Sequence, residues 1–342
     1  MKLLDRIKNS GITGFRFKGK KFDIPSIWRI ITTEYSHWLS FLVLLVVAVI
    51  VSPSFLAWSN LSNQFVQGAI VGICAMGMSL VISAGMIDLS AGSAVALISG
   101  LGITVLNSTG SVFLCLLFCL GAGLMVGLIN GILVTKGRIA PFIVTLAAMS
   151  AWRSVINQLG QGGPFTVSRA MYDSYRAVAA DRHWLIPGVL DIPNLMFFFV
   201  IVTIITMILM SKTKFGAYVY AIGSNQQAAR LSGIPVDRVK TLIFVYAGAL
   251  YGLAGFLLGS RLTAIQAASA GSAYEMDAIA AVAIGGTSMA GGKGKIMGTF
   301  LGVLMLRIIS TVLIMARVPP FLNGLVQGII IVIAVLAQNR RK

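Results

Sequence analysis

The chain has 342 residues, of which 57% are hydrophobic and 11% are charged, and its formal net charge is +17. Soluble domains are usually about a quarter charged, so this composition excludes an ordinary soluble protein and indicates a chain that crosses a membrane several times. The excess of lysine and arginine does not predict nucleic-acid binding, because these residues lie at the ends of apolar runs and form no basic soluble domain.

Cysteine and histidine are scarce and do not form a recognisable site. All three cysteines lie in apolar runs, where a thiol behaves as a small buried hydrophobic group. Only two histidines are present, which makes a histidine-based metal site improbable. We therefore expect no disulfide framework, no metal site and no cofactor bound by this chain.

Residues 1–36 are basic and polar, and they are too long and too charged for a signal peptide. They predict a cytoplasmic N-terminal tail with an interfacial helix around Ile24–Ile31. Residues 37–338 are expected to form the transmembrane domain, and residues 339–342 a short cytoplasmic tail.

The apolar runs predict an all-α, polytopic membrane protein with about ten transmembrane helices. Their expected bounds are His37–Trp58, Leu61–Ser83, a third span around Ala94–Leu106, Val112–Thr135, Ile139–Leu159, Asn194–Met210, Thr241–Ser260, Ala273–Gly285, Ile296–Ala316 and Pro320–Ala337. With ten spans and the N-terminus inside, every lysine falls on the cytoplasmic side, so both termini are predicted to be cytoplasmic. The lysine-free loop Gln161–Pro193 then faces outwards.

Two spans look too short to cross a bilayer unaided. The run Ala94–Leu106 has 13 residues where about 20 are needed, so the third span is expected to include part of the polar stretch 84–93 and to bring Asp88 into or near the membrane. The alternative is that Asp88 caps a helix at the water interface. The eighth helix is also short. To cross the bilayer it must be extended by the glycine-rich stretch after it, or lie in a thin site where protein buries its backbone. Ser272 and Glu275 fit a capping box at its start.

Polar side chains within these spans are candidates for the translocation path, because polar groups at membrane depth usually serve function. They are Asp88, Ser90, Ser93, Asn130, Glu275, Asp277 and Arg307. Arg307 lies near the middle of the ninth span and should face the bundle interior or a cavity. There it would influence which substrate is carried, or it would pair with another group across the bundle.

The stretch Lys212–Lys240 is the most basic segment between two apolar runs. Ser224 as N-cap and Gln227 at N3 fit a capping box, Gly233 is a natural helix C′ residue, and Pro235 can open a second short helix. The pattern predicts a helix–turn–helix knob that is either a docking site for a soluble partner or a well-capped connector. Its candidate contact residues are Gly223, Asn225, Ala228, Ala229, Arg230, Leu231 and Gly233.

No nucleotide site is expected. The segment Gly286–Lys293 superficially resembles a P-loop, but Thr287 stands where the first glycine is required and Gly294 where serine or threonine should follow the lysine. Few acids could lie in the membrane, which argues against an ion-coupled carrier and for energy supplied from elsewhere.

Four motifs together resemble one transporter family. They are Tyr220–Ile234 (YAIGSNQQAARLSGI), Ile87–Ser93 (IDLSAGS), Tyr274–Ala281 (YEMDAIAA) and Gly285–Gly294 (GGTSMAGGKG). They closely resemble segments of ribose-type ABC importer permeases, and the resemblance extends over about Leu61–Ala337.

That resemblance implies a non-enzymatic permease subunit in a bacterial cytoplasmic (inner) membrane that moves a monosaccharide inward. It implies a second copy or a related permease, two cytoplasmic ATPase subunits that bind ATP and magnesium, and an extracytoplasmic solute-binding protein. The coupling role would fall on Asn225–Gly233. An ion-coupled secondary sugar carrier and a channel are the alternatives.

Overall fold

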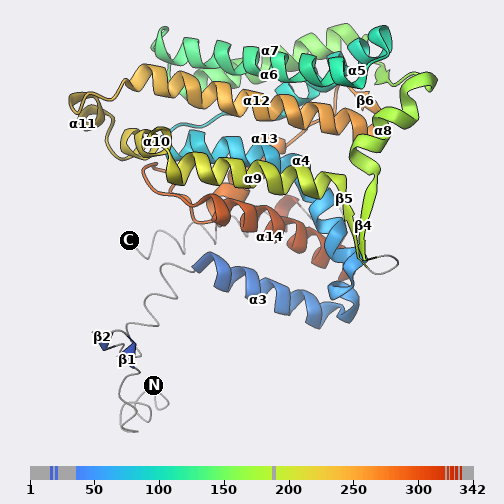
Figure 1. Ribbon diagram of the computed structural model, residues 1–342, viewed down its shortest axis with the longest axis horizontal. Helices are drawn as coiled ribbons and strands as arrows, with labels where there is room; N and C mark the ends of the chain where they lie inside the picture. The colour runs from blue at the N-terminus through green and yellow to red at the C-terminus, as the bar shows by residue number, and fades with distance from the viewer. Residues whose placement is uncertain are drawn as a thin grey trace.

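The computed structural model describes residues 16–17, 20–21, 36–186 and 190–319, together with scattered positions between 322 and 332. Long helices lie side by side along one direction, with α10 (Lys214–Ser224) and α11 (Gln226–Leu231) at one end of the bundle, α8 (Tyr172–Ala180), β4 (Arg182–Ile186) and β5 (Leu190–Pro193) at the other, and the short helix α13 (Tyr274–Ile284) in the middle (Figure 1). The expected helix at 24–31, the final tail and most of the expected tenth span lie outside the described residues.

The described part is mostly helical, and six of its helices are long and apolar enough to cross a membrane: α4, α5, α6, α9, α12 and α14. The long helices are α3 Ser36–Val51, α4 Trp58–Ser83, α5 Ala91–Thr109, α6 Val112–Thr135, α7 Pro141–Gly160, α9 Asn194–Lys212, α12 Val236–Leu262 and α14 Ile296–Met315. The short helices are η1 Pro53–Leu56, η2 Arg169–Met171, α8 Tyr172–Ala180, α10 Lys214–Ser224, α11 Gln226–Leu231 and α13 Tyr274–Ile284.

Several helix boundaries differ from the sequence-based expectation, and three of the differences change the layout of the elements. The first helix ends at Val51 because Pro53 begins a separate 3₁₀ turn. The third helix takes in only residues 91–93 of the polar stretch, and residues 84–90 form a non-helical segment between α4 and α5. Pro235 opens no separate short helix, because α12 continues unbroken from Val236 through the expected seventh span.

The described residues are mostly helical, as predicted, but they also include three short antiparallel strand pairs. They are β1 Arg16–Phe17 with β2 Lys20–Lys21, β3 Pro164–Thr166 with β6 Ala264–Gln266, and β4 Arg182–Ile186 with β5 Leu190–Pro193. The last two pairs lie at the same end of the bundle as α8 (Figure 1). Strands of two to five residues are too short to show a clear alternation in sequence.

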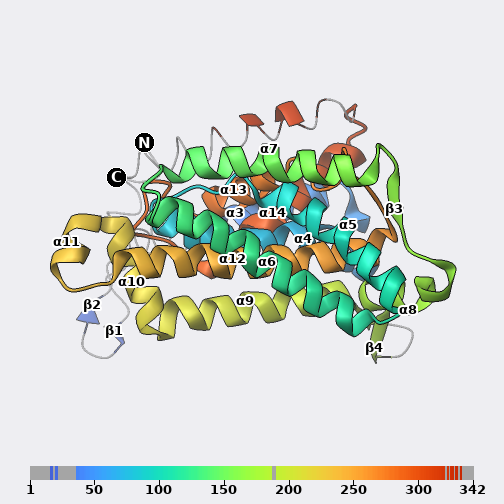
Figure 2. The same cartoon turned by 90° about the horizontal axis from the view of Figure 1, so that it is seen from above.

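Helix α12 runs through the middle of the bundle and packs closely on α6 (Figures 1 and 2). Glycines on both helices make this approach possible. A Cβ atom added at Gly127 would overlap the carbonyl oxygen of Phe244, and one added at Gly248 would overlap that of Gly123. Small residues spaced by four allow helix backbones to approach closely in lipid, where the hydrophobic effect does not drive helices together.

The segments that connect helices at the α10–α11 end of the bundle carry most of the described lysines. The hydroxyl of Tyr220 donates to the carbonyl oxygen of Gly294 at 3.0 Å, and one cavity is lined by both Arg138 and Gln226. These contacts bring the segments 136–140, 212–240 and 285–295 together. The lysines in them are Lys136, Lys212, Lys214, Lys240, Lys293 and Lys295.

Candidate functional site

The knob at this end is built from α10 and α11. Asn225, not Ser224, is the N-cap of α11, because Ser224 still belongs to α10 while the Asn225 side chain accepts a hydrogen bond from the Ala228 amide at 2.9 Å. Gly233 has a φ of +78°, as a C′ glycine should, and the Ile234 amide donates back to the carbonyl oxygen of Ala229. The predicted short capped helix is therefore present, with its start one residue later.

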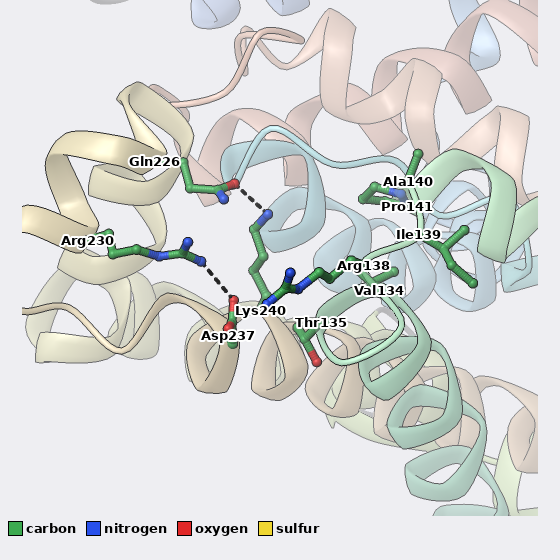
Figure 3. A pocket seen from close by; sticks show the side chains of 10 residues that line it. All are labelled: Val134, Thr135, Arg138, Ile139, Ala140, Pro141, Gln226, Arg230, Asp237 and Lys240. Carbon is green, nitrogen blue, oxygen red and sulfur yellow. Dashed lines mark hydrogen bonds and ion pairs between the residues drawn. The ribbon is translucent and has the colours of Figure 1, made fainter.

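Two polar contacts tie α11 to the start of α12 (Figure 3). The Lys240 ammonium donates to the Gln226 side-chain oxygen at 2.6 Å, and Arg230 pairs with Asp237 at 3.2 Å. They cross a cavity of about 570 Å³ that Arg138 also lines. The Arg230–Asp237 pair is largely exposed, so it orients the helix more than it stabilises the fold.

The two faces of α11 differ sharply in exposure. Ala229 is 4% exposed, whereas Leu231 is 90% exposed. The expectation that Ala229 belongs to an exposed contact face is therefore wrong, since this side chain packs inside the knob. Leu231 is the largest apolar side chain that α11 exposes to solvent.

Gly223, near the end of α10, lies where two non-helical interruptions between helices meet. The first is residues 84–90, between α4 and α5, and the second is residues 285–295, between α13 and α14. A Cβ atom there would overlap the carbonyl oxygen of Ser83, where α4 ends, and the amide nitrogen of Gly292 in the loop after α13. The Gly292 amide in turn donates to the Ser83 carbonyl oxygen at 2.9 Å. The knob thus contacts the segment 84–90 and the segment 285–295 at one point.

A buried polar network holds the first interruption. Asp88 is 1% exposed and accepts hydrogen bonds from the amide and hydroxyl of Ser90, at 2.8 and 2.6 Å, and from the hydroxyl of Tyr251 at 3.2 Å. The side-chain amide of Asn130 donates to the Ser90 hydroxyl oxygen at 2.9 Å. The alternative in which Asp88 caps a helix at the water interface is wrong, because Ser90 occupies the N-cap position and Asp88 is enclosed.

The second interruption, residues 285–295, follows the short helix α13, which has Glu275 and Asp277 in its first turn as expected. Ser272 does not cap it, because Ala273 is the N-cap and makes no side-chain cap. Arg307 on α14 pairs with Asp277 through a contact of 2.8 Å. This contact identifies the partner of the mid-span arginine.

The seven path candidates therefore separate into three groups. Asp88, Ser90 and Asn130 belong to the enclosed network, and Asp277 and Arg307 form the ion pair. Ser93 and Glu275 line a second cavity, of about 250 Å³. The sequence interpretation missed three polar residues of this cavity: Ser150, Arg153 and Ser272. The first two lie inside the fifth apolar run, where a serine and an arginine were a usable signal.

Comparison with known proteins identifies the family of this chain. Residues 60–335 match the family model described as branched-chain amino acid transport system / permease component. The ribose import permease protein RbsC of Bacillus subtilis is 41% identical over 303 residues, which cover 89% of this chain and 92% of that protein.

Two relatives from Escherichia coli K12 extend the comparison. Its RbsC is 34% identical over 313 residues, covering 90% of this chain and 94% of that protein. Its xylose transport system permease protein XylH is 31% identical over 342 aligned positions, covering 84% of this chain and 87% of that protein. No solved structure matches the chain. The chain belongs to the family of branched-chain amino acid transport system / permease components.

Proposed function

We propose that this chain is the membrane-spanning permease subunit of an ATP-binding-cassette importer for a monosaccharide of the ribose or xylose type. The observation that carries the proposal is similarity over 84–90% of the chain to permeases named for ribose import and xylose transport. Similarity of this extent gives no comparable support to an ion-coupled secondary carrier.

The proposal places the protein in the bacterial cytoplasmic membrane with ten spans and both termini inside. A second permease copy completes the path, an extracytoplasmic binding protein delivers the sugar, and cytoplasmic ATPase subunits bind ATP and magnesium. The chain itself then acts as a transport subunit without a nucleotide site. The gathering of lysines around α10 and α11 favours that end as the cytoplasmic one.

Reconstitution into liposomes tests the reaction class. The permease alone should exchange no radiolabelled D-ribose or D-xylose, with or without an imposed proton or sodium gradient. Addition of the ATPase, ATP with magnesium and the binding protein should start accumulation of at least one of these sugars. Gradient-driven uptake by the permease alone would replace the importer proposal with the secondary carrier.

The knob is the proposed ATPase contact, and its exposed leucine supplies the sharpest test. Burial of a leucine contributes about 1.5–3 kcal/mol, so Leu231→Asp should weaken co-purification of the ATPase by about tenfold or more. Leu185→Asp is the matched control, because Leu185 is also exposed but lies on β4 at the other end of the bundle. Equal ATPase recovery with both variants would make α11 a connector only.

A further inference from the structure

The cavity of about 250 Å³ lies where three helices meet: the first turn of α5, the middle of α7 and the first turn of α13. Drug-sized ligands usually occupy about 300–1,000 Å³, so this space suits a smaller molecule. The side chains that matter to its chemistry are Ser93, Met149, Ser150, Arg153, Ser272 and Glu275.

The cavity is at half the height of the bundle. Ser150 is the tenth residue of the 20-residue helix α7, as counting from Pro141 gives. At about 1.5 Å per residue, it lies about 15 Å from either end of that helix. Interrupted helices that expose their ends at such a depth are a recurring way to build a substrate site in transporters.

Charges at the cavity balance. Arg153 contributes one positive charge and donates through one nitrogen to the carbonyl oxygens of Ala267 and Ala270, at 2.8 Å each. Glu275 contributes one negative charge, and its carboxylate lies against Gly92, where a Cβ atom would overlap it. A site with one charge of each sign disfavours a net-charged solute and suits a neutral one.

The remaining groups suit a polyol. The hydroxyls of Ser150 and Ser272 can each donate and accept hydrogen bonds, as the hydroxyls of a sugar do, and the Glu275 carboxylate accepts them. The buried Ser93 hydroxyl donates to the Ser90 carbonyl oxygen at 3.0 Å, so it holds the first turn of α5 at the edge of the cavity. Met149 adds an adaptable apolar contact for the carbon-bound hydrogens of a sugar ring. Ser150 and Ser272 are exposed in the single chain, so a solute can reach them from the open side of the cavity.

We propose that this cavity is the subsite in which a neutral monosaccharide is held by its hydroxyl groups as it passes the middle of the membrane. The inference rests on the proposed import function and assigns Ser150 and Glu275 as the specificity-determining contacts. The polar network around Asp88 then supports the first turn of α5 and does not contact the sugar.

Valine and threonine have the same shape and differ by one hydroxyl, so they isolate the hydrogen bond. In liposomes that hold permease, ATPase and binding protein, Ser150→Val should lower the rate of D-ribose uptake per assembled complex by about two- to tenfold, and Ser150→Thr should retain more of it. Glu275→Gln should lower the rate by about tenfold or more, because a charged acceptor is lost. Ser154→Val and Ser154→Thr are the controls, since Ser154 lies one turn along α7 and does not line the cavity.

The possible results distinguish a failure of the subsite from a failure of the import function on which it rests. If the unaltered complex accumulates neither D-ribose nor D-xylose, the import proposal fails and the subsite fails with it. If the unaltered complex accumulates sugar but Ser150→Val matches Ser150→Thr and Glu275→Gln matches the Ser154 controls, only the subsite is overturned. A larger Val–Thr difference at 150 than at 154, with an altered ratio of D-ribose to 2-deoxy-D-ribose uptake, supports it.

Discussion

Asp88 accepts three hydrogen bonds inside the bundle, yet no basic side chain contacts its carboxyl group among the described residues. Burying such a group is costly unless every oxygen is satisfied. Ser90 and Tyr251 satisfy both oxygens, and in doing so they join the start of α5 to α12. The carboxyl group therefore fixes the non-helical segment 84–90 in place.

Substitutions at Asp88 should separate shape from charge. Asp88→Asn keeps an oxygen for the two Ser90 donors, and its amide can donate to the Tyr251 hydroxyl oxygen, so stability and sugar uptake should remain close to those of the unaltered protein. Asp88→Leu strands the Ser90 donors and should lower the free energy of unfolding by about 2–4 kcal/mol. Thermal unfolding in detergent checks both changes. A strong loss of uptake by a stable Asp88→Asn protein would place this carboxylate beside the sugar.

At the scale of single elements, the helices α13 and α14 are joined by the pair Asp277–Arg307. Both side chains are partly buried, at 28% and 20% exposure. Breaking a buried pair by removing one partner usually costs more than replacing both partners with apolar groups. The half-length helix α13 is thereby fixed to a full-length neighbour.

This pair predicts a non-additive result. Arg307→Met alone leaves Asp277 without its cation and should lower the melting temperature, and adding Asp277→Leu should recover part of that loss. The partial exposure keeps both effects modest. Melting temperatures of the two variants in the same detergent decide the matter, and a double variant that is less stable than Arg307→Met would contradict the assigned pairing.

Gly223 connects the knob to both interruptions, so a methyl group there should disturb coupling more than folding. In Gly223→Ala the added carbon must displace the backbone of Ser83 or Gly292. With the complete importer in liposomes, we expect ATP hydrolysis to persist and sugar uptake per ATP to fall. Gly121→Ala is the control, because a Cβ atom at Gly121 meets no atom within 4 Å. Equal uptake per ATP in both variants would remove Gly223 from the coupling route.

Most helix positions could be predicted from apolar runs, and α6 has the predicted bounds Val112–Thr135. Features that depend on packing could not. Ser224 and Asn225 are equally good caps by composition, and only the backbone path decides that α10 ends at one and α11 is capped by the other. Likewise Ser150 and Ser154 are chemically identical and lie one turn apart on the same face of α7. Only the packing of α5 and α13 against this part of α7 places the first at the cavity.

At the scale of the whole molecule, the two ends of the bundle differ in chemistry. The end with α8, β4 and β5 is held by Asp191, which pairs with Arg182 at 2.7 Å and accepts a hydrogen bond from the Trp58 indole at 3.1 Å. The hydrogen bond from Arg182 lowers the pKa of the Asp191 carboxyl group from its usual value. The opposite end carries α10, α11 and the lysines of three converging segments.

This asymmetry predicts the orientation of the protein in the membrane. Lys212, Lys214, Lys293 and Lys295 are exposed at the α10–α11 end, so an impermeant amine-directed label should modify them in inside-out vesicles. The same label should modify no lysine of this chain in intact cells or spheroplasts, because the loop 161–193 contains none. Mass spectrometry of the peptides measures the labelling of each lysine in both preparations. The positive control for access from outside is a lysine introduced at the other end of the bundle by Arg182→Lys. Labelling of Lys214 or Lys293 in intact cells would reverse the topology, and with it the assignment of α11 to the ATPase side, since nucleotide-driven subunits act from the cytoplasm.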